Sequence, residues 1–423
     1  MKLQKTFLLL RGALFLFLFT FFGRSAASPQ DLGDVPTRVE LGKGVIADAV
    51  KKDSEAERAG LQVGDILLSW TRDGSKGEVE SPFDLPLIEV EQAPRGAVTI
   101  EGLRGTEKRA WVLGPGSWGI HVRPNVPESL YVEGQKLVAA GKTQDAAQYW
   151  RSVVQAVQGS QPSWLAPWFL YHTGELLADA RQWKEADSLF QEAIERSASE
   201  SATKVLLLRA WAASFEQRAD WENAKKYYQA AADASPKSNS KSLLFADILD
   251  GIGGGAGHHG DLVEAERSYS QALQIQQRLA PGSLILVKSL NGLGHIARRQ
   301  GDLAKAEKYH SQALVISQKF DPGGRDVAAS FQGLGTASME RGDLAKAEEY
   351  DSQALAIHER IGPGSIDVAS SLLNLAIVAT RRGDLSKAEE YNRQGLAIKE
   401  KLAPGSLSVA KTLENMGLVA IER

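Results

Sequence analysis

The sequence contains no cysteine among its 423 residues. Disulfides, thiolate nucleophiles and cysteine-ligated metal sites are therefore excluded, and the chain suits a reducing or an oxidising compartment equally well. The sequence also lacks a strong excess of charge. Its 49 lysines and arginines are nearly balanced by 52 acidic residues, which gives a net charge of −3, and the two signs are interspersed. Nothing in this composition favours binding to nucleic acid.

Complete catalytic and nucleotide-binding motifs are also missing. The stretch "GAGHHG" at 255–260 satisfies Gly-x-Gly-x-x-Gly, but it lies where a helix is expected, without the preceding strand of a dinucleotide site. The stretch "AAGKT" at 139–143 resembles the end of a phosphate loop, yet Lys136 stands where that loop requires glycine. "PGSWG" at 115–119 has proline in place of the first glycine of a nucleophile elbow.

Histidine offers no metal site either. His258 and His259 are adjacent, so they point in different directions on a helix, and neither has a histidine or acidic partner at metal-ligand spacing. No His-Glu-x-x-His motif is present. We therefore predict a protein that is not an enzyme and that has no cofactor and no metal site.

Long apolar runs are confined to the N-terminus. Lysine and arginine precede an apolar run at 13–22, and the small residues Ser25-Ala26-Ala27 follow it. This pattern is typical of a secretory signal over residues 1–27, with cleavage after Ala27 and a mature chain that starts at Ser28. The run is shorter than the roughly 20 residues of a comfortable membrane span. We expect export to the periplasm or cell envelope; the alternative is an uncleaved segment that anchors the protein in the membrane.

The rest of the chain is dominated by a repeated phrase. "GDLAKAEKYHSQAL" at 301–314 and "GDLAKAEEYDSQAL" at 342–355 agree at twelve of fourteen positions. Looser copies begin at Gly260 and Gly383, so that the four glycines are 41 residues apart, and Pro-Gly pairs at 281, 322, 363 and 404 keep the same step. A fixed period of this length indicates a repeat architecture.

Each repeat predicts two helices. Apolar residues recur every three or four positions in both halves, and Gly301-Asp302 ends the first helix and caps the second. Two antiparallel helices bury little alone, so neighbouring repeats must stack to complete the core. The expected buried positions of one repeat are Val287, Leu290, Leu293, Ile296 and Ala297 in the first helix, and Leu303, Ala306, Tyr309, Ala313 and Val315 in the second.

These residues resemble the tetratricopeptide repeat in its longer form, which kinesin light chains carry. The family pattern of Leu, Leu-Gly, Ala, aromatic and Ala falls on Leu290, Leu293-Gly294, Ala306, His310 and Ala313. The large aromatic stands one place earlier, at Tyr309, and similarly at Tyr350 and Tyr391. Earlier, more divergent units carry Ala146/Trp150, Ala186/Phe190, Ala224/Tyr228 and Ala265/Tyr269. We count seven repeats and a final half-repeat, divergent over 127–240 and regular over 241–423.

A different region precedes the repeats, at residues 37–124. The stretch "SEAERAGLQVGDILL" from Ser54 to Leu68 resembles the core motif of bacterial PDZ domains. That resemblance implies a small α+β domain that binds an extended peptide by adding a strand to a sheet edge. The alternative is a PDZ fold that serves as a structural spacer. The residues implied in peptide binding are Leu41, Gly42, Val45, Ile46 and Ala47.

The predicted fold is therefore mainly α, a tetratricopeptide α-solenoid preceded by a small α+β domain. In the family the first helix of each repeat lines a concave face that holds a partner; an ordinary solvated face is the alternative for its residues. The residues implied for that face are Lys288, Asn291, His295, Arg298, Gln332, Ser370 and Arg381.

Two functions remain compatible with the sequence. The first is an exported, non-enzymatic scaffold that binds protein or peptide ligands, with the repeat array and the PDZ-like region acting independently. The second is the recognition part of a larger caspase-like or other protease system whose catalytic domain lies outside this chain, because a caspase-like centre needs a cysteine. The partner and its motif are not encoded in any recognisable pattern.

Overall fold

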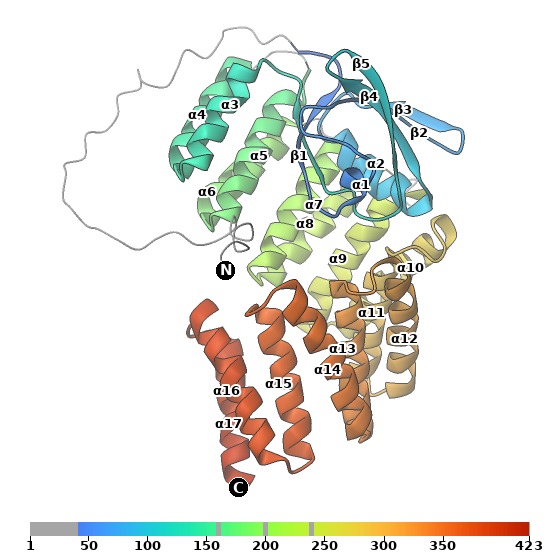
Figure 1. Cartoon of the computed structure of the whole chain (residues 1–423), viewed down its shortest axis with the longest axis vertical. Helices are drawn as coiled ribbons and strands as arrows, with labels where there is room; N and C mark the ends of the chain where they lie inside the picture. Colours follow the sequence, from blue (N-terminus) through green and yellow to red (C-terminus); the bar gives the residue numbers. More distant parts are fainter. Residues whose placement is uncertain (1–40, 158–161, 198–201, 237–240, 423) are drawn as a thin grey trace, which may run out of the picture. The chain divides into compact units, whose positions relative to one another are not determined.

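The computed structural model describes residues 41–157, 162–197, 202–236 and 241–422 (Figure 1). The predicted signal at 1–27 lies outside the described residues. The first part of the described chain forms a small antiparallel sheet, drawn in blue and teal in Figure 1. Its elements are β1 (Val45–Val50), α1 (Glu55–Arg58), β2 (Ile66–Arg72), β3 (Ser75–Glu78), α2 (Asp84–Gln92), the 3₁₀ turn η2 (Ala93–Arg95), β4 (Val98–Arg104), β5 (Glu107–Leu113) and β6 (Ile120–Pro124).

The sheet runs in the order β5-β4-β2-β1-β6, and β3 pairs with β2. Alternate residues of the strands point inward, as the period of two requires, and Trp118 closes the core from the loop before β6. The hairpin expected near Arg104-Gly105 is present, because Arg104 of β4 pairs with Glu107 of β5. The sheet region, residues 41–126, thus has its own apolar core.

The expected position of the peptide-binding edge is wrong. β1 is an interior strand: Val45 and Ile46 pair with β2 on one side and with β6 on the other. The Gly42 N–H is also used, since it donates to the Asn125 carbonyl at 2.7 Å. No edge at Leu41 to Ala47 is therefore free to accept another strand, and β6 occupies the outer position in the sheet order.

The remaining described chain is helical. Its helices are α3 (Glu128–Ala139), α4 (Thr143–Val157), α5 (Leu165–Asp179), α6 (Trp183–Arg196), α7 (Ala202–Gln217), α8 (Trp221–Asp233), α9 (Leu243–His259), α10 (Leu262–Leu279), α11 (Leu286–Arg299), α12 (Leu303–Phe320), α13 (Arg325–Arg341), α14 (Leu344–Ile361), α15 (Ile366–Arg381), α16 (Leu385–Leu402) and α17 (Leu407–Glu422). Consecutive helices pack in pairs, from α3 with α4 to α15 with α16, and α17 packs on α16. Within the described residues this is the predicted solenoid of seven helix pairs and a half-repeat. We call the odd-numbered helices from α3 to α17 first helices and the even-numbered ones second helices.

The repeated Gly-Asp forms the turn between the two helices of a pair. Gly260, Gly301, Gly342 and Gly383 have φ of +86°, +84°, +90° and +77°, a conformation that only glycine adopts readily. Each following aspartate caps the second helix; Asp302, for example, accepts the Lys305 N–H at 2.9 Å. The phrase therefore encodes a left-handed turn and an N-cap.

One second-helix side chain in each pair lies between two neighbouring first helices. His310 fills this intercalated position with Gly294 and Gly333 against it, and a Cβ on either glycine would lie within 2.6 Å of the ring. The position therefore keeps its buried role even where the aromatic is lost, while Tyr309 is only partly buried. Along the array it holds Trp150, Phe190, Tyr228, Tyr269, His310, Asp351 and Asn392, all of them buried.

Neighbouring repeats are also joined by buried hydroxyl groups. Ser289 donates to Asp250 at 2.5 Å and to Gln276 at 2.8 Å. The hydroxyl at the same position of each later repeat is also hydrogen-bonded to a polar group of the preceding repeat. The series Ser289, Ser330, Ser371 and Thr412 keeps the step of 41 residues. Because an unpaired buried polar group costs free energy, these bonds fix the register in which repeats stack.

One expected core position is wrong. Val315 is 70% exposed, and the neighbouring Ile316 packs on the core in its place. Ala306 and Ala313 are buried as expected, so the start of α12 buries the predicted face. Near the end of the helix the inward-facing apolar residue is one position later than predicted.

Candidate functional site

The predicted peptide-binding residues at the start of the sheet region border a cavity. Leu41 and Gly42, with Leu68 and Val79 of the sheet region and Trp164 from the segment before α5, line a hollow of about 520 Å³. Val45 and Ala47, in contrast, are fully buried in the core of the sheet region. The structure therefore separates the predicted set into cavity-lining loop residues, core residues and Ile46, which is half-buried.

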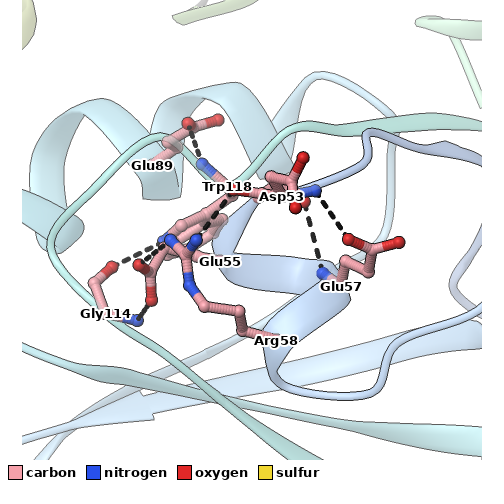
Figure 2. Close-up of polar contacts among 8 residues, drawn as sticks. Asp53, Glu55, Glu57, Arg58, Glu89, Gly114 and Trp118 are labelled. Atoms are coloured by element: carbon pink, nitrogen blue, oxygen red, sulfur yellow. Dashed lines mark hydrogen bonds and ion pairs between the residues drawn. The ribbon is translucent and has the colours of Figure 1, made fainter. Parts of the chain in front are cut away.

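A polar network holds the loop before the outer strand β6. Figure 2 shows Glu89 of α2 accepting the Trp118 N–H, with 2.9 Å between Oε1 and N, and Glu55 of α1 accepting the Gly114 N–H at 3.0 Å. Burial raises the pKa of Glu89, and this effect exceeds the opposing influence of the Trp118 hydrogen bond and of Arg209. The two short helices thus supply carboxylates to the main chain at this end of the sheet (Figure 2).

The first helices present a polar surface that we call the first-helix face, defined by the predicted residues on α11, α13 and α15. Lys288 is exposed at the N-terminal end of α11. Desolvation opposes its charge, but the carboxylates of Asp247, Asp250 and Glu216 outweigh this and raise the Lys288 pKa. Lys288 therefore stays protonated and balances part of an acidic group of side chains.

Two predicted contact residues are occupied by the array itself. Asn291 donates from Nδ2 to Ser330 at 3.1 Å, and its Oδ1 lies 3.0 Å from His310 Nδ1. Gln332 donates to Ser371 at 3.2 Å. Both side chains are half-buried. These two residues therefore join neighbouring repeats and have limited capacity for a partner.

Three further predicted residues make local contacts on the same face. Arg298 pairs with Glu340 of the next first helix at 2.5 Å. Arg381 donates to the Met339 carbonyl at 3.2 Å, and Ser370 donates to the Ile366 carbonyl at 2.9 Å within its own helix. Arg298 and Arg381 bridge successive first helices, which places these residues on one continuous surface.

His295 lies at a hollow of about 360 Å³ between the first helices α9 and α11. Desolvation, Arg298, Arg299 and His258 together lower the His295 pKa to about 4, so its imidazole is neutral at physiological pH. His258 stacks on Trp221 with ring centroids 3.6 Å apart. The residues that line this α9–α11 hollow are Gly254, Gly257, His258, Tyr269, Gly292, His295, Ile296 and Arg299.

Sequence reasoning found His295 but missed the other polar groups of the hollow. Tyr269 was expected only as a packing residue, and Arg299 was not singled out. One signal was available: three lining glycines, Gly254, Gly257 and Gly292, stand in helices where glycine costs about 1 kcal/mol relative to alanine. Glycine at such positions indicates space that the fold keeps open or a close approach by another side chain.

The Gly-x-Gly-x-x-Gly match lies on a helix and its C-cap. "GAGHHG" lies at the end of the helix α9 and at its left-handed C-cap Gly260, so no strand precedes it. Across the part of the chain that the structure describes, no group of three His, Cys, Asp or Glu side chains could hold a metal ion. In the same residues, no helix combines the length and apolar character that a membrane span requires.

Comparison with known proteins identifies the repeat. Residues 244–319 and 326–401 match the family model described as tetratricopeptide repeat. These segments are tetratricopeptide repeats. They include α9 to α16, and therefore the whole α9–α11 hollow and most of the first-helix face. Proteins with such repeats generally act as interaction scaffolds rather than enzymes. The matched segments do not include the sheet region, whose likeness to PDZ domains stays a prediction.

Comparison with solved structures returns matches of low sequence identity. A Rap protein complexed with competence and sporulation factor is 16% identical, covering 70% of this chain and 89% of that one, with a TM-score of 0.49. A tetratricopeptide repeat protein from Parabacteroides merdae is 13% identical, covering 69% and 98%, with a TM-score of 0.48. BtubC (BKLC) from P. vanneervenii is 19% identical, covering 56% and 92%, with a TM-score of 0.39. No curated protein sequence matches the chain significantly.

Proposed function

We propose that this protein is a non-enzymatic scaffold that binds polypeptide partners on the first-helix face of its repeat array. The observation that carries the proposal is the exposure of Lys288 and His295 beside residues that are already engaged. Neither side chain has a hydrogen bond within the described chain, whereas Asn291 and Gln332 are used between repeats. A surface that exposes a cation and an imidazole beside side chains already held by the array suits recognition of a helix or an extended segment.

The test is a pull-down from cell-envelope extract, in which captured proteins are identified by mass spectrometry and their affinities are then measured singly. The double variant Lys288→Ala/His295→Ala should fold, because both side chains are exposed, and should weaken at least one partner by about tenfold. Lys308→Ala/Gln312→Ala, two exposed positions on the second helix α12, is the matched control. Unchanged affinity of every partner for the first variant would contradict the proposal.

For the sheet region we propose a partner of the same class, an extended polypeptide, at the outer edge of β6. Support comes from the sheet order, since β6 has β1 on one side and no strand on the other within the described residues. A photo-crosslinking residue at His121 of β6 should capture partner protein. The same residue at exposed Gln62, in the loop before β2, should not.

We also propose that the protein acts after export, in the periplasm or cell envelope. The proposal rests on the N-terminal sequence, where positive residues, an apolar run and Ser25-Ala26-Ala27 follow in that order. A scaffold without cysteine would not depend on the redox state of that compartment.

A further inference from the structure

Helix α17 carries a stripe of residues that stays exposed in the described chain. Its other side is held in place, because Lys399 of α16 donates to Thr412 at 2.9 Å and Asn415 donates to Asn392 at 3.0 Å. Leu413, in contrast, is 49% exposed. The residues that we call the α17 stripe lie three and four positions apart on one side of the helix, and they are Ala410, Leu413, Gly417 and Ala420.

Earlier repeats bury the same stripe under a second helix. The equivalents of the exposed leucine are Leu372, Phe331 and Leu290, which are 3%, 6% and 2% exposed. In each of these repeats the second helix of the pair packs on the first, and Phe331 stacks on Tyr350 with ring centroids 6.0 Å apart. The α17 stripe is therefore one half of the interface that joins the helices of a pair, and no second helix covers it within the described residues.

A socket at Gly417 matches the one that holds His310. A Cβ built on the equivalent Gly294 of α11 would lie 2.6 Å from His310 Nε2, because that ring enters from the second helix α12. A Cβ built on Gly417 would meet nothing within 4 Å outside the backbone of its own helix. The glycine thus keeps the space for an intercalated side chain, and this space is open among the described residues.

The charge beside the socket indicates which side chain fits it. In α11 the Asn291 side chain holds the intercalated ring, with 3.0 Å between its Oδ1 and His310 Nδ1. Three periods later α17 carries Glu414 at the position of Asn291, and Glu414 is exposed. A carboxylate accepts a stronger hydrogen bond from a cation than a neutral amide does. The socket at Gly417 therefore favours a cationic donor and disfavours a carboxylate.

A second copy of α17 fits the stripe poorly. Each Leu413 enters the Gly417 socket of the other helix only in an antiparallel pair whose twofold axis crosses the helices at the level of Asn415. Glu414 then lies beside its own symmetry mate, and like charges on adjacent helices are destabilising. A different helix that brings a cationic donor meets no such repulsion.

We propose that the α17 stripe binds an amphipathic helix of a partner protein, which packs on α17 as α12 packs on α11. This helix inserts a histidine or another cationic donor at Gly417, beside Glu414. It has small residues at the positions of Ala306 and Ala313, which are fully buried in α12 and allow the helices to pack closely. The stripe is separate from the first-helix face, so the inference goes beyond the proposed function.

The test uses the whole mature protein and a fluorescent peptide of residues 301–320, which comprise α12 and its Gly-Asp turn, with both ends blocked. Fluorescence anisotropy should show saturable binding to wild-type protein. Gly417→Leu should weaken this binding by about tenfold or more, because the new side chain fills the socket. Lys411→Ala, an exposed change on α17 outside the stripe, is the matched control and should bind like wild type.

An exchange of charge tests the role of Glu414. A peptide with His310→Asp should bind wild-type protein about tenfold less tightly than the unchanged peptide, because its carboxylate meets Glu414. Glu414→Lys should reverse the order of the two peptides. Glu422→Lys makes the same change at another exposed position of α17, outside the stripe, and should leave the preference for histidine unchanged.

Thermal melting, followed by circular dichroism, shows whether the stripe is free. Gly417→Leu should melt no lower than wild type, because leucine meets no neighbour there and favours a helix more than glycine does. A lower melting temperature would mean that the stripe is already covered and would overturn the proposal. Self-association of wild type that is lost in Gly417→Leu, measured by light scattering, would assign the stripe to a second copy instead.

The peptide measurements also separate this inference from the proposed function. Wild-type protein that does not bind the peptide, or Gly417→Leu that binds it as tightly as wild type, would contradict the α17 site and leave the first-helix face untouched. Lys288→Ala/His295→Ala should bind the peptide like wild type. Weaker binding by that variant would place the peptide on the first-helix face rather than on α17.

Discussion

Asp351 occupies the intercalated position of its repeat and is 2% exposed. Its one side-chain partner in the described chain is Asn374, whose Nδ2 lies 3.5 Å from Oδ1. Burial raises the Asp351 pKa to about 7, and the Asn374 hydrogen bond opposes this only in part. His310, at the same position one repeat earlier, has a pKa lowered by burial and by His295 and Arg298 to about 4. Ionisation of Asp351 therefore lowers stability as pH rises, whereas protonation of His310 lowers stability as pH falls.

Replacement of Asp351 by asparagine should stabilise the protein at pH 8 and not at pH 4. The folded-state pKa of about 7 exceeds the ordinary aspartate value of 3.8, so the stability associated with this group is complete below about pH 4 and is lost as pH rises through 7. Asparagine does not titrate and avoids this loss. We expect Asp351→Asn to gain about 2–4 kcal/mol at pH 8 and to change by less than about 0.5 kcal/mol at pH 4.

The next repeat supplies the reciprocal control. Asn392 holds the equivalent position and is fully buried, so Asn392→Asp should lose stability at pH 8 and little at pH 4. Thermal melting at both pH values, followed by circular dichroism, checks both variants. A gain for Asp351→Asn that is equal at the two pH values would show that ionisation of Asp351 is not the cause.

The helix glycines provide a second test at the scale of single residues. A Cβ at position 333 would lie 2.3 Å from His310 Cε1, so Gly333→Ala should force the ring to shift and cost about 1–3 kcal/mol. A Cβ at position 257 would meet its nearest neighbour, Ile296 Cδ1, at 3.5 Å, an ordinary contact. Gly257→Ala should therefore gain up to about 1 kcal/mol of helix propensity. Melting shifts of the same sign for both would contradict the packing described here.

At the scale of elements, helix α9 begins against the sheet region. Glu91 of α2 accepts the Leu243 and Leu244 N–H groups at 3.1 and 3.0 Å and the Ser242 hydroxyl at 2.6 Å. The first N–H groups of a helix have no intrahelical acceptor, and a carboxylate also suits the positive end of the helix dipole. Arg95 pairs with the same carboxylate at 2.9 Å. One side chain thus caps a helix that is about 150 residues distant in sequence.

Removal of this cap should loosen the start of α9. We expect Glu91→Ala to destabilise the protein by about 2 kcal/mol, because it leaves amide groups and Arg95 without their acceptor. Hydrogen exchange at the Leu243 and Leu244 amides should accelerate. Glu107→Ala, which removes an exposed carboxylate on β5, is the control and should leave both amides protected. Equal protection in the two variants would mean that the cap is dispensable.

At the scale of the whole molecule, the sheet region and the repeat array are joined by specific contacts. Besides the Glu91 cap, Tyr131 of α3 donates to Asp48 of β1 at 2.9 Å, and Phe83 packs on Tyr171 of α5 with ring centroids 5.9 Å apart. The sheet region and the array therefore cover part of each other's surface, and independent binding of partners by the two stays a prediction. The first-helix face and the sheet therefore belong to one packed unit.

Export is the prediction that concerns the chain as a whole. If the N-terminal segment is a secretory signal, protein isolated from the cell envelope should begin at Ser28. N-terminal sequencing decides the question directly. An intact Met1 on envelope protein would favour the membrane-anchored alternative, and a variant with Ala27→Arg, which places a large charged residue at the cleavage position, should accumulate in that uncleaved form.

Much of the array could be predicted from the sequence because its signals are local and repeated. The 41-residue step, the Gly-Asp turn and the alanines of the helix contact each act within a few residues or between adjacent repeats. The candidate face was predictable only in part. Lys288 and His295 are exposed as expected, but the half-burial of Asn291 follows from Ser330, which the pattern does not link to it.

The sequence alone determined the repeat, its turns and its helix pairs, since these follow from backbone conformation and helical periodicity. Only the tertiary structure decided which strands form the edges of the sheet, because strand order depends on pairing between segments such as β1 and β6 that lie some 70 residues apart. It also decided where the hollow lies. Tyr269 meets Gly292 only after helices from two repeats stack, so the hollow that both line is a property of packing rather than of any local pattern.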